Sequence, residues 1–207
     1  FRRVLFRSEP LADVASGGPP IGLRGDFQRR NGAVAVAMAM ALADLGWPIG
    51  AAAIRHGLAH ARWPGRLEEH RWRGHTLLLD GAHNPPAALA LREELTARDG
   101  LAPRRWLLGI QRHKEAEAML RALLVPGDQA LITPIPGHAS WDRPALAAAC
   151  PELADQLQAV MDPAAGLAEL LRPCGPAQPG LQPPLPVVAG SLYLLGELLS
   201  RFSAEPA

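Results

Sequence analysis

The sequence predicts an α/β protein with a mostly parallel sheet and helices on both faces. From residue 68 onward, short strand-like apolar runs alternate with longer helix-like runs, which is the pattern of a parallel sheet crossed by helices. Its 207 residues are 48% hydrophobic and 20% charged, which is enough apolar material for a core and argues against a disordered chain. A change in composition at residues 63–66 marks where this pattern begins.

The alternating pattern assigns each element in order. We expect strands near residues 68–72, 76–79, 106–110, 130–134, 157–161 and 187–189. We expect helices near residues 86–97, 114–124, 143–149, 163–171 and 192–202. Residues 173–186 are rich in Pro, Gly and Gln and predict an exposed loop. Because ligands of open parallel sheets bind at the carboxyl ends of the strands, functional residues should follow the strands.

The part before residue 63 lacks the alternating strand and helix pattern and predicts helices only. Residues 33–45, rich in Ala, Met and Leu, predict a largely buried helix, and a second helix is expected near residues 50–61. These two helices offer too little surface to fold alone, so we expect three segments: a disordered or non-native lead at 1–20, a helical remnant of a preceding domain at 21–62, and a domain at 63–207. The chain starts at Phe1 rather than Met, and we expect a truncated reading frame.

Charge and cysteine content exclude several classes of function. The net charge of +1 gives no electrostatic case for nucleic acid or an anionic membrane surface. Cys150 and Cys174 form no CxxC pair, so neither a structural zinc site nor a disulfide framework is expected. No apolar run is long enough to suggest a membrane span, and no signal peptide is seen. We therefore expect a cytoplasmic protein.

The most informative motif is His-Thr-Leu-Leu-Leu-Asp-Gly-Ala-His-Asn-Pro-Pro at residues 75–86. An apolar strand ends in Asp80, a tight turn brings His83 and Asn84, and two prolines open a helix. A carboxylate, an imidazole and an amide thus meet at the end of a strand beside a helix N-terminus. The carboxylate can accept both hydroxyls of a ribose, and the helix N-terminus favours anions. An ordinary capped turn is the simpler interpretation.

This motif resembles the signature of the Mur ligase superfamily, in the form found in its folylpolyglutamate synthase/dihydrofolate synthase branch. Three further stretches agree in the same order. Residues 27–31 resemble the family's His-Gln-x-x-Asn helix start, with Phe27 in place of His; residues 63–66 resemble its Pro-Gly-Arg turn; residues 190–194 resemble its Gly-Ser-hydrophobic run. The resemblance covers about residues 22–202 and implies the C-terminal half of such an enzyme, with a Rossmann-like domain preceded by helices of a truncated P-loop ATPase domain.

The resemblance also implies a reaction and its partners. The family uses ATP and Mg²⁺ to convert a folate or dihydropteroate carboxylate into an acyl phosphate, which the amine of L-glutamate then attacks. It implies adenine contact by Asn31, phosphate contact by Arg66 and ribose contact by Asp80, with His83 and Ser191 near the incoming glutamate. Arginine suits phosphate because it is always charged and can bind two oxygens. Asn31 and Ser191 could instead be helix caps, and Arg66 a solvated surface residue.

Lys114 is the only lysine and follows the strand expected near residues 106–110, so we expect it in the site. The family often has Asp-Lys-Asp at this position, whereas this chain has His113 and Glu115 on either side of the lysine. His138 and Asp142 read as ordinary loop residues. The sequence contains no Gly-Lys followed by Ser or Thr, so it has no P-loop. We therefore expect the magnesium ligands to lie in an N-terminal part of the ligase. We also expect the isolated fragment to be inactive. The absence of GxGxxG disfavours a dinucleotide oxidoreductase.

Two other interpretations stay open at this point. One is another Mur-type amino-acid ligase, which shares the fold and the ATP chemistry but uses another acceptor. The other is a non-catalytic α/β binding module. For the ligase we expect a monomer that binds small molecules and neither nucleic acid nor membrane.

Overall fold

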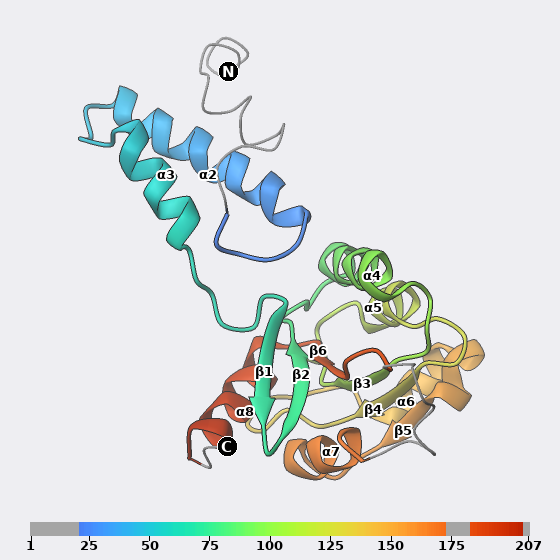
Figure 1. Ribbon diagram of the computed structural model, residues 1–207. Coiled ribbons are helices and arrows are strands. Elements are labelled where there is room, and N and C mark those ends of the chain that lie inside the picture. Colours follow the sequence, from blue (N-terminus) through green and yellow to red (C-terminus); the bar gives the residue numbers. More distant parts are fainter. Residues whose placement is uncertain (1–20, 173–182, 205–207) are drawn as a thin grey trace. The chain divides into compact units, whose positions relative to one another are not determined.

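The computed structural model describes residues 21–172 and 183–204 (Figure 1). The chain divides into two compact units, residues 1–64 and residues 65–207. The expected lead at residues 1–20 and most of the expected loop at residues 173–186 lie outside the described residues. No helix within the described ranges is long and apolar enough to cross a membrane.

The first unit contains two helices, α2 (Phe27–Asp44) and α3 (Ala51–His60). They meet where α2 has a glycine: a Cβ on Gly32 would lie 3.6 Å from Leu58 Cδ2. The expectation that residues 33–45 form a largely buried helix is confirmed for the helix and wrong for its burial. The helix begins at Phe27, in keeping with the helix start expected at residues 27–31, but only Val36 of residues 33–45 is buried. Its apolar residues occupy more than one side of the helix, and a single partner helix covers only one side.

The second unit is built on a six-stranded sheet in the order β1-β2-β6-β3-β4-β5. β1 is antiparallel to β2 and every other pair is parallel, which confirms the predicted mostly parallel sheet. The strands are β1 (Glu68–Trp72), β2 (His75–Leu79), β3 (Arg105–Leu108), β4 (Gln129–Ile132), β5 (Leu157–Ala159) and β6 (Val187–Ala189). The last strand of the chain, β6, lies between β2 and β3 and therefore near the centre of the sheet.

Helices cover both faces of this sheet, as the sequence predicts. α4 and α5 lie on one face and α7 and α8 on the other (Figure 1). The helices are α4 (Pro85–Asp99), α5 (Ala116–Leu123), α6 (Arg143–Ala149), α7 (Pro163–Leu170) and α8 (Leu192–Ala204). On the α7 and α8 face, alternate strand residues pack against helix leucines; this core contains Leu77, Leu79, Leu107, Leu131, Leu167, Leu170, Val188, Leu194, Leu195, Leu198 and Phe202.

Some local details differ from the sequence prediction. A short 3₁₀ helix, η1 (Pro151–Gln156), connects α6 to β5 and was not predicted. The strands β3, β4 and β5 end two residues earlier than expected, at Leu108, Ile132 and Ala159. Beyond the ends of β3 and β4, the two segments that follow these strands leave the sheet. They pair with each other through an isolated β-bridge between Gln111 and Ser140.

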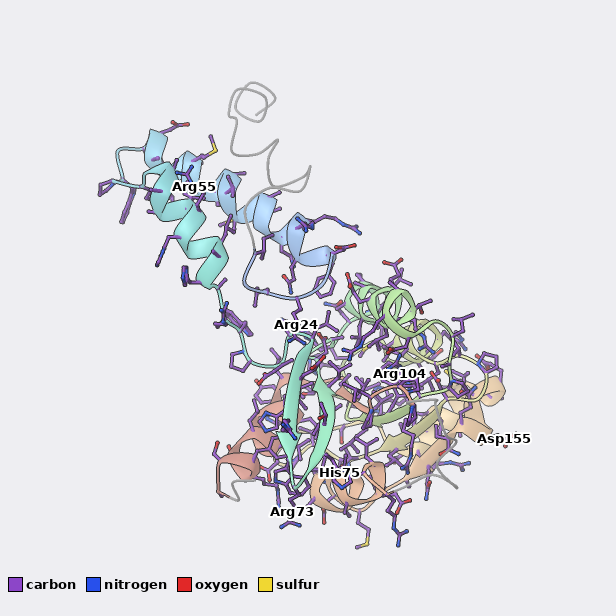
Figure 2. All side chains as sticks on the ribbon, viewed as in Figure 1. Arg24, Arg55, Arg73, His75, Arg104 and Asp155 are labelled. Atoms are coloured by element: carbon purple, nitrogen blue, oxygen red, sulfur yellow. The ribbon has the colours of Figure 1, made fainter. Side chains whose placement is uncertain are left out.

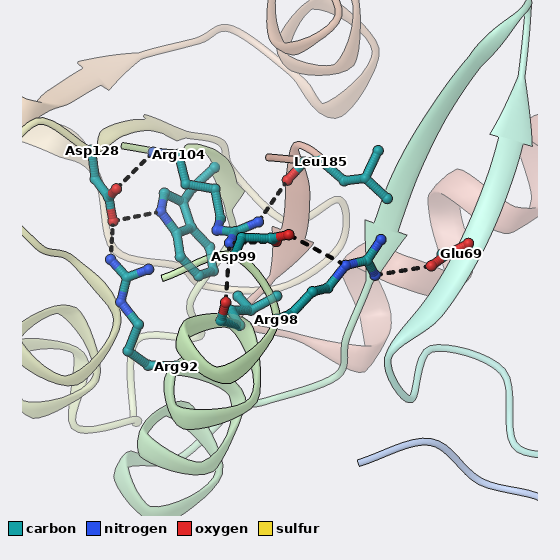
Figure 3. Close-up of polar contacts among 9 residues, drawn as sticks. Glu69, Arg92, Arg98, Asp99, Arg104, Asp128 and Leu185 are labelled. Carbon is teal, nitrogen blue, oxygen red and sulfur yellow. Dashed lines mark hydrogen bonds and ion pairs between the residues drawn. The ribbon is translucent and has the colours of Figure 1, made fainter. Parts of the chain in front are cut away.

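The N-terminal edge of the parallel strands holds a buried polar network around Asp128 (Figure 3). Its Oδ2 accepts hydrogen bonds from Arg92 Nη2 at 2.7 Å and from Trp106 Nε1 at 3.0 Å, and its Oδ1 accepts one from the Arg104 backbone amide at 2.8 Å. The Arg104 side chain is itself buried and bonds Asp99 Oδ2 at 2.9 Å and the Leu185 carbonyl at 3.2 Å. The starts of β3, β4 and β6 are tied together by these bonds.

Candidate functional site

The five parallel strands all end at one edge of the sheet, which we call the C-terminal edge. The segments that leave β2, β6 and β3 lie side by side there, because these strands are neighbours in the sheet. Four residues expected in the site come from these segments: Asp80 and His83 after β2, Ser191 after β6, and Lys114 after β3. The sequence motif, the last Gly-Ser run and the segment that carries the single lysine therefore all leave the sheet at this edge.

Asp80 follows β2 directly and is 3% exposed. Its Oδ2 accepts the Leu67 amide at 3.0 Å and its Oδ1 accepts the Ala82 amide at 2.8 Å. Burial raises the pKa of the Asp80 carboxyl above its ordinary value of 3.8, although these two amides and the positive charge of Arg66 oppose the rise. The carboxylate thus holds two backbone segments together, and its contact with a ribose stays a prediction.

Arg66 is held between two hydrogen bonds to the end of β2. Gly65 accepts the Gly81 amide at 2.7 Å, and Leu67 donates to Asp80. Gly81 gives Arg66 room, because a Cβ there would lie 3.3 Å from Arg66 Nη1 and 2.3 Å from Leu192 Cδ2. The turn itself is constrained, since Gly65 has φ +70° and a Cβ on it would meet Leu195. Local backbone contacts therefore place this guanidinium beside the Asp-Gly turn.

His83 and Asn84 lead from the turn into α4. His83 Nδ1 lies 2.8 Å from the Gly81 carbonyl, so that nitrogen donates the bond and Nε2 is the nitrogen left for a ligand. Asn84 Oδ1 accepts the Ala87 amide at 2.9 Å and caps the helix, and the prolines occupy its first turn. Asn84 therefore caps the helix, whereas half-buried His83 stays available to bind a ligand.

Ser191 lies between β6 and α8 and is 1% exposed. Its Oγ accepts the Tyr193 amide at 3.1 Å, so it does cap the helix, as the alternative interpretation allowed. Gly190 has φ +102°, and a Cβ there would lie 2.7 Å from the Gly109 carbonyl. This close approach of the chain after β6 to the chain after β3 requires glycine and leaves no room for a side chain.

Lys114 stands at the end of the segment that follows β3. Its carbonyl accepts Trp141 Nε1 at 3.3 Å, and its side chain is half-buried. Its ammonium forms no ion pair with a carboxylate of the described residues. A charged group without a partner at this edge is available for an anion.

Asn31 belongs to the first unit, residues 1–64. It lies in the second turn of α2, is exposed, and its Nδ2 donates to Gln28 Oε1 at 2.9 Å. The helix starts at Phe27 with Asp26 as its first flanking residue, so the alternative that Asn31 caps the helix is wrong. Its contact with adenine stays a prediction.

Two aromatic side chains at the C-terminal edge were not singled out from the sequence. The Tyr193 ring contacts the His138 ring in a tilted arrangement with the ring centroids 3.8 Å apart, and Trp141 lies under the Arg112 guanidinium at 4.0 Å. Tyr193 follows the Gly-Ser run by two residues, which was a usable signal. The position of His138 could not be read from sequence because its loop follows a different strand. Asp142, in contrast, caps α6 through the Ala145 amide, as an ordinary loop residue does.

The described residues contain no group of three or more His, Cys, Asp or Glu side chains that could hold a metal ion. The C-terminal edge instead combines cationic side chains with the N-termini of two long helices, α4 and α8. Such an arrangement suits anions, because both the side chains and the exposed backbone amides attract negative charge. The chemistry that the edge supports is therefore the binding of phosphates or carboxylates.

Comparison with known families gives a match to the model described as dihydrofolate synthetase, C-terminal domain, over residues 66–201. Among curated proteins, the chain is 35% identical over 120 residues to a folylpolyglutamate synthase of Lacticaseibacillus casei. That match includes 56% of this chain and 27% of the relative. It is 32% identical over 189 residues to a probable bifunctional folylpolyglutamate synthase/dihydropteroate synthase of Halobacterium salinarum, covering 88% of this chain and 21% of the relative.

Solved structures give the same result at the level of fold. The chain is similar to a Mycobacterium tuberculosis folylpolyglutamate synthase complexed with ADP, with a TM-score of 0.69 and 25% identity over 90% of this chain and 42% of that one. A Thermotoga maritima folylpolyglutamate synthase gives a TM-score of 0.62 and 26% identity over 88% of this chain and 40% of that one. The chain thus spans less than half the length of these relatives.

Proposed function

The chain belongs to the family of dihydrofolate synthetase C-terminal domains, and we propose from this premise that it serves an ATP-dependent ligase that joins L-glutamate to a folate or dihydropteroate carboxylate. The chain would supply the C-terminal part of such a ligase, in keeping with its span of 27% of the Lacticaseibacillus relative and 42% of the Mycobacterium relative. The 21–62 segment would be the end of an ATPase domain, and residues 63–207 the glutamate-ligase domain.

One observation carries this proposal most directly: Arg66 is fixed at the C-terminal edge by bonds on both of its sides and has no carboxylate at ion-pair distance among the described residues. The backbone on both sides of Arg66 is held in place, and the fork of donors on its guanidinium, which has no carboxylate partner among the described residues, matches phosphate oxygens. Asp80 contributes by holding the neighbouring backbone. The ADP complex of the Mycobacterium relative agrees with a nucleotide site in this family.

The other proposed site residues would each have a separate role in phosphoryl transfer or substrate binding. In the proposed reaction a terminal phosphoryl group passes from ATP to the acceptor carboxylate, and the glutamate amine then attacks the acyl carbon and releases phosphate. Lys114 would offset the negative charge that develops on the phosphoryl oxygens. His83, through Nε2, and Ser191, at the start of α8, would orient the incoming glutamate. Asn31 would contact adenine.

Magnesium would neutralise phosphate charge in such a reaction. The described residues contain no group of ligands for it, so we propose that its ligands come from another part of the ligase and assign no step of this chain to the metal. Cytoplasmic location, a monomeric state and the absence of nucleic-acid or membrane partners stay predictions from the sequence.

The test is ADP release with ATP, Mg²⁺, L-glutamate and dihydropteroate or a reduced folate. The chain alone should give no substrate-dependent turnover, because its sequence has no P-loop to hold the phosphates. The chain joined to the ATP-binding part of a relative should turn over. In that protein Arg66→Ala should lower the response to ATP by about 10- to 100-fold, equivalent to roughly 1.5–3 kcal/mol for a charged hydrogen bond.

A matched control is Arg71→Ala, which removes an exposed arginine from β1. Turnover by the chain alone would contradict the half-site interpretation. Wild-type ATP response in Arg66→Ala would contradict the phosphate assignment, and absence of turnover in the joined, folded protein would contradict the ligase function itself.

A further inference from the structure

The turn that carries Arg66 has a backbone conformation that leucine rarely adopts. Both neighbours of Arg66 lie in the left-handed region, Gly65 at φ +70° and Leu67 at φ +43°. Glycine enters this region freely, whereas the Cβ of a leucine is brought close to its own backbone there. A residue stays in such a conformation only where the surrounding contacts hold it, so this turn depends on its hydrogen bonds.

A side chain of β1 closes this turn. Two hydrogen bonds to the segment after β2 hold the turn from one side. A third comes from β1, where Glu68 Oε2 accepts the Gly65 amide at 2.7 Å. Glu68 is the first residue of β1 and is paired with Leu79 of β2, so the sheet sets its position. Its carboxylate therefore reaches back along the chain and fixes the residue that precedes Arg66.

The second oxygen of the Glu68 carboxylate also has a neighbour. Oε1 lies 3.8 Å from His70 Nδ1, and both side chains are half-buried. Glu68 and His70 alternate with an exposed residue along β1 and therefore share one face of the strand. The His70 ring stacks on Phe202 of α8 with the ring centroids 4.5 Å apart. Contacts at both oxygens thus restrain the orientation of the carboxylate.

We propose that Glu68 is a positioning residue for Arg66: it holds the left-handed turn and thereby keeps the guanidinium at the C-terminal edge, where a phosphate would bind it. This inference rests on the proposed function, which gives Arg66 the phosphate contact, and it assigns a further residue to that contact. A carboxylate suits this task because a charged acceptor bonds an amide more strongly than a neutral one. Among the described residues no carboxylate, Glu68 included, forms an ion pair with Arg66, so the donors of the guanidinium stay available to phosphate oxygens.

The first experiment examines the turn in the whole 207-residue chain by NMR, without a ligand. The wild type should show a strong NOE between the amide and α protons of Leu67, which marks a positive φ, and slow hydrogen exchange at the Gly65 amide. Glu68→Ala should weaken this NOE and speed that exchange about tenfold, because the amide loses its acceptor. Glu68→Gln keeps an oxygen acceptor at the same position and should retain most of the wild-type behaviour. The same spectra report folding, and Glu68→Leu, which keeps the bulk without an acceptor, replaces Glu68→Ala should that variant unfold.

The second experiment measures the KM for ATP in the chain joined to the ATP-binding part of a relative. Glu68→Ala should raise this KM about 3- to 10-fold, and Glu68→Gln should return it to within about twofold of the wild type. In an Arg66→Ala background, Glu68→Ala should raise the KM no further, because two residues that act through one contact are not additive. Glu69→Ala, which removes an exposed carboxylate from the opposite face of β1, is the matched control and should keep the wild-type KM.

The contrary results distinguish this inference from the proposed function. If Glu68→Ala keeps both the Leu67 NOE and the slow exchange of Gly65, Glu68 does not hold the turn, and the inference is overturned while the proposed function stands. If Glu68→Ala and Arg66→Ala raise the KM independently, Glu68 acts on overall stability rather than on Arg66, which also overturns the inference. If the joined wild type shows no turnover although NMR shows the turn held by Glu68, the proposed function fails, and the phosphate role fails with it.

Discussion

Arg92 and Arg104 at the N-terminal edge of the sheet are paired with carboxylates, whereas Arg66 and Arg112 at the C-terminal edge have no carboxylate partner in the part of the chain that the structure describes. Arg92 and Arg104 lie at the first edge and bond buried or half-buried carboxylates (Figure 3). Figure 2 shows Arg104 and His75 at this edge, where β3 and β2 begin. At the other edge, Arg66 and Arg112 form no ion pair with a described carboxylate.

We interpret this difference as the structural use of arginine at one edge and its proposed use in binding at the other. A buried arginine must be paired, because an unpaired buried charge costs several kcal/mol. An arginine at a strand's carboxyl end can stay unpaired at little cost only where solvent or a ligand reaches it. The edge proposed to bind ligands is thus the one at which Arg66 and Arg112 have no carboxylate partner among the described residues.

The largest effect should come from Asp128→Ala at the N-terminal edge. The change leaves Arg92 buried without its partner and removes the acceptor of Trp106 Nε1, so we expect a loss of about 3–5 kcal/mol in the free energy of unfolding. Urea unfolding of the whole chain measures it. Asp155→Ala, at an exposed position in η1, should change stability by less than about 0.5 kcal/mol. A loss below about 1 kcal/mol for Asp128→Ala would show that the network does not hold this edge together.

A smaller effect is expected from Gly190→Ala at the C-terminal edge. The residue has φ +102°, and the new Cβ would meet the Gly109 carbonyl at 2.7 Å, a backbone atom that cannot rotate away. We expect a loss of about 2–3 kcal/mol, again by urea unfolding. Gly196→Ala is the matched control, because nothing lies within 4 Å of its added Cβ and it lies inside α8. That variant should gain about 0.5–1 kcal/mol, and equal effects of the two would contradict the close approach of the chains.

The smallest effect concerns the pH dependence that Asp80 contributes. Burial raises the pKa of its carboxyl in the folded state above 3.8, so the folded chain binds the proton more tightly than the unfolded chain. The stability from this group is fully present below the unfolded pKa and is lost as pH rises through the folded pKa. The wild type should therefore lose stability relative to Asp80→Asn over this window, measured by urea unfolding between about pH 3 and pH 8. If the wild type instead gained stability relative to Asp80→Asn as the pH rises, the sign would be reversed and the dominance of burial contradicted.

Much of the fold could be predicted from the sequence. The six strands and the helices of the second unit lie within a few residues of their expected positions, since apolar runs and turn residues specify them locally. The helix at residues 27–44 was predicted in type but not in burial. The burial of a helix depends on which elements pack against it. The sequence of α2 alone therefore does not determine how much of its surface a partner covers.

The candidate site was likewise predicted in part from local sequence patterns and in part only by tertiary contacts. The sequence by itself determined the strand-turn-helix around Asp80 and the Gly-Ser start of α8, because both are local patterns in which a strand ends and a helix needs a cap. Only the tertiary structure decided that the segments after β2, β6 and β3 are neighbours, that the Asp80 carboxylate turns inward to the Leu67 amide, and that the His138 ring contacts Tyr193. Those contacts join residues far apart along the chain, and they are set by sheet order and packing rather than by any local pattern.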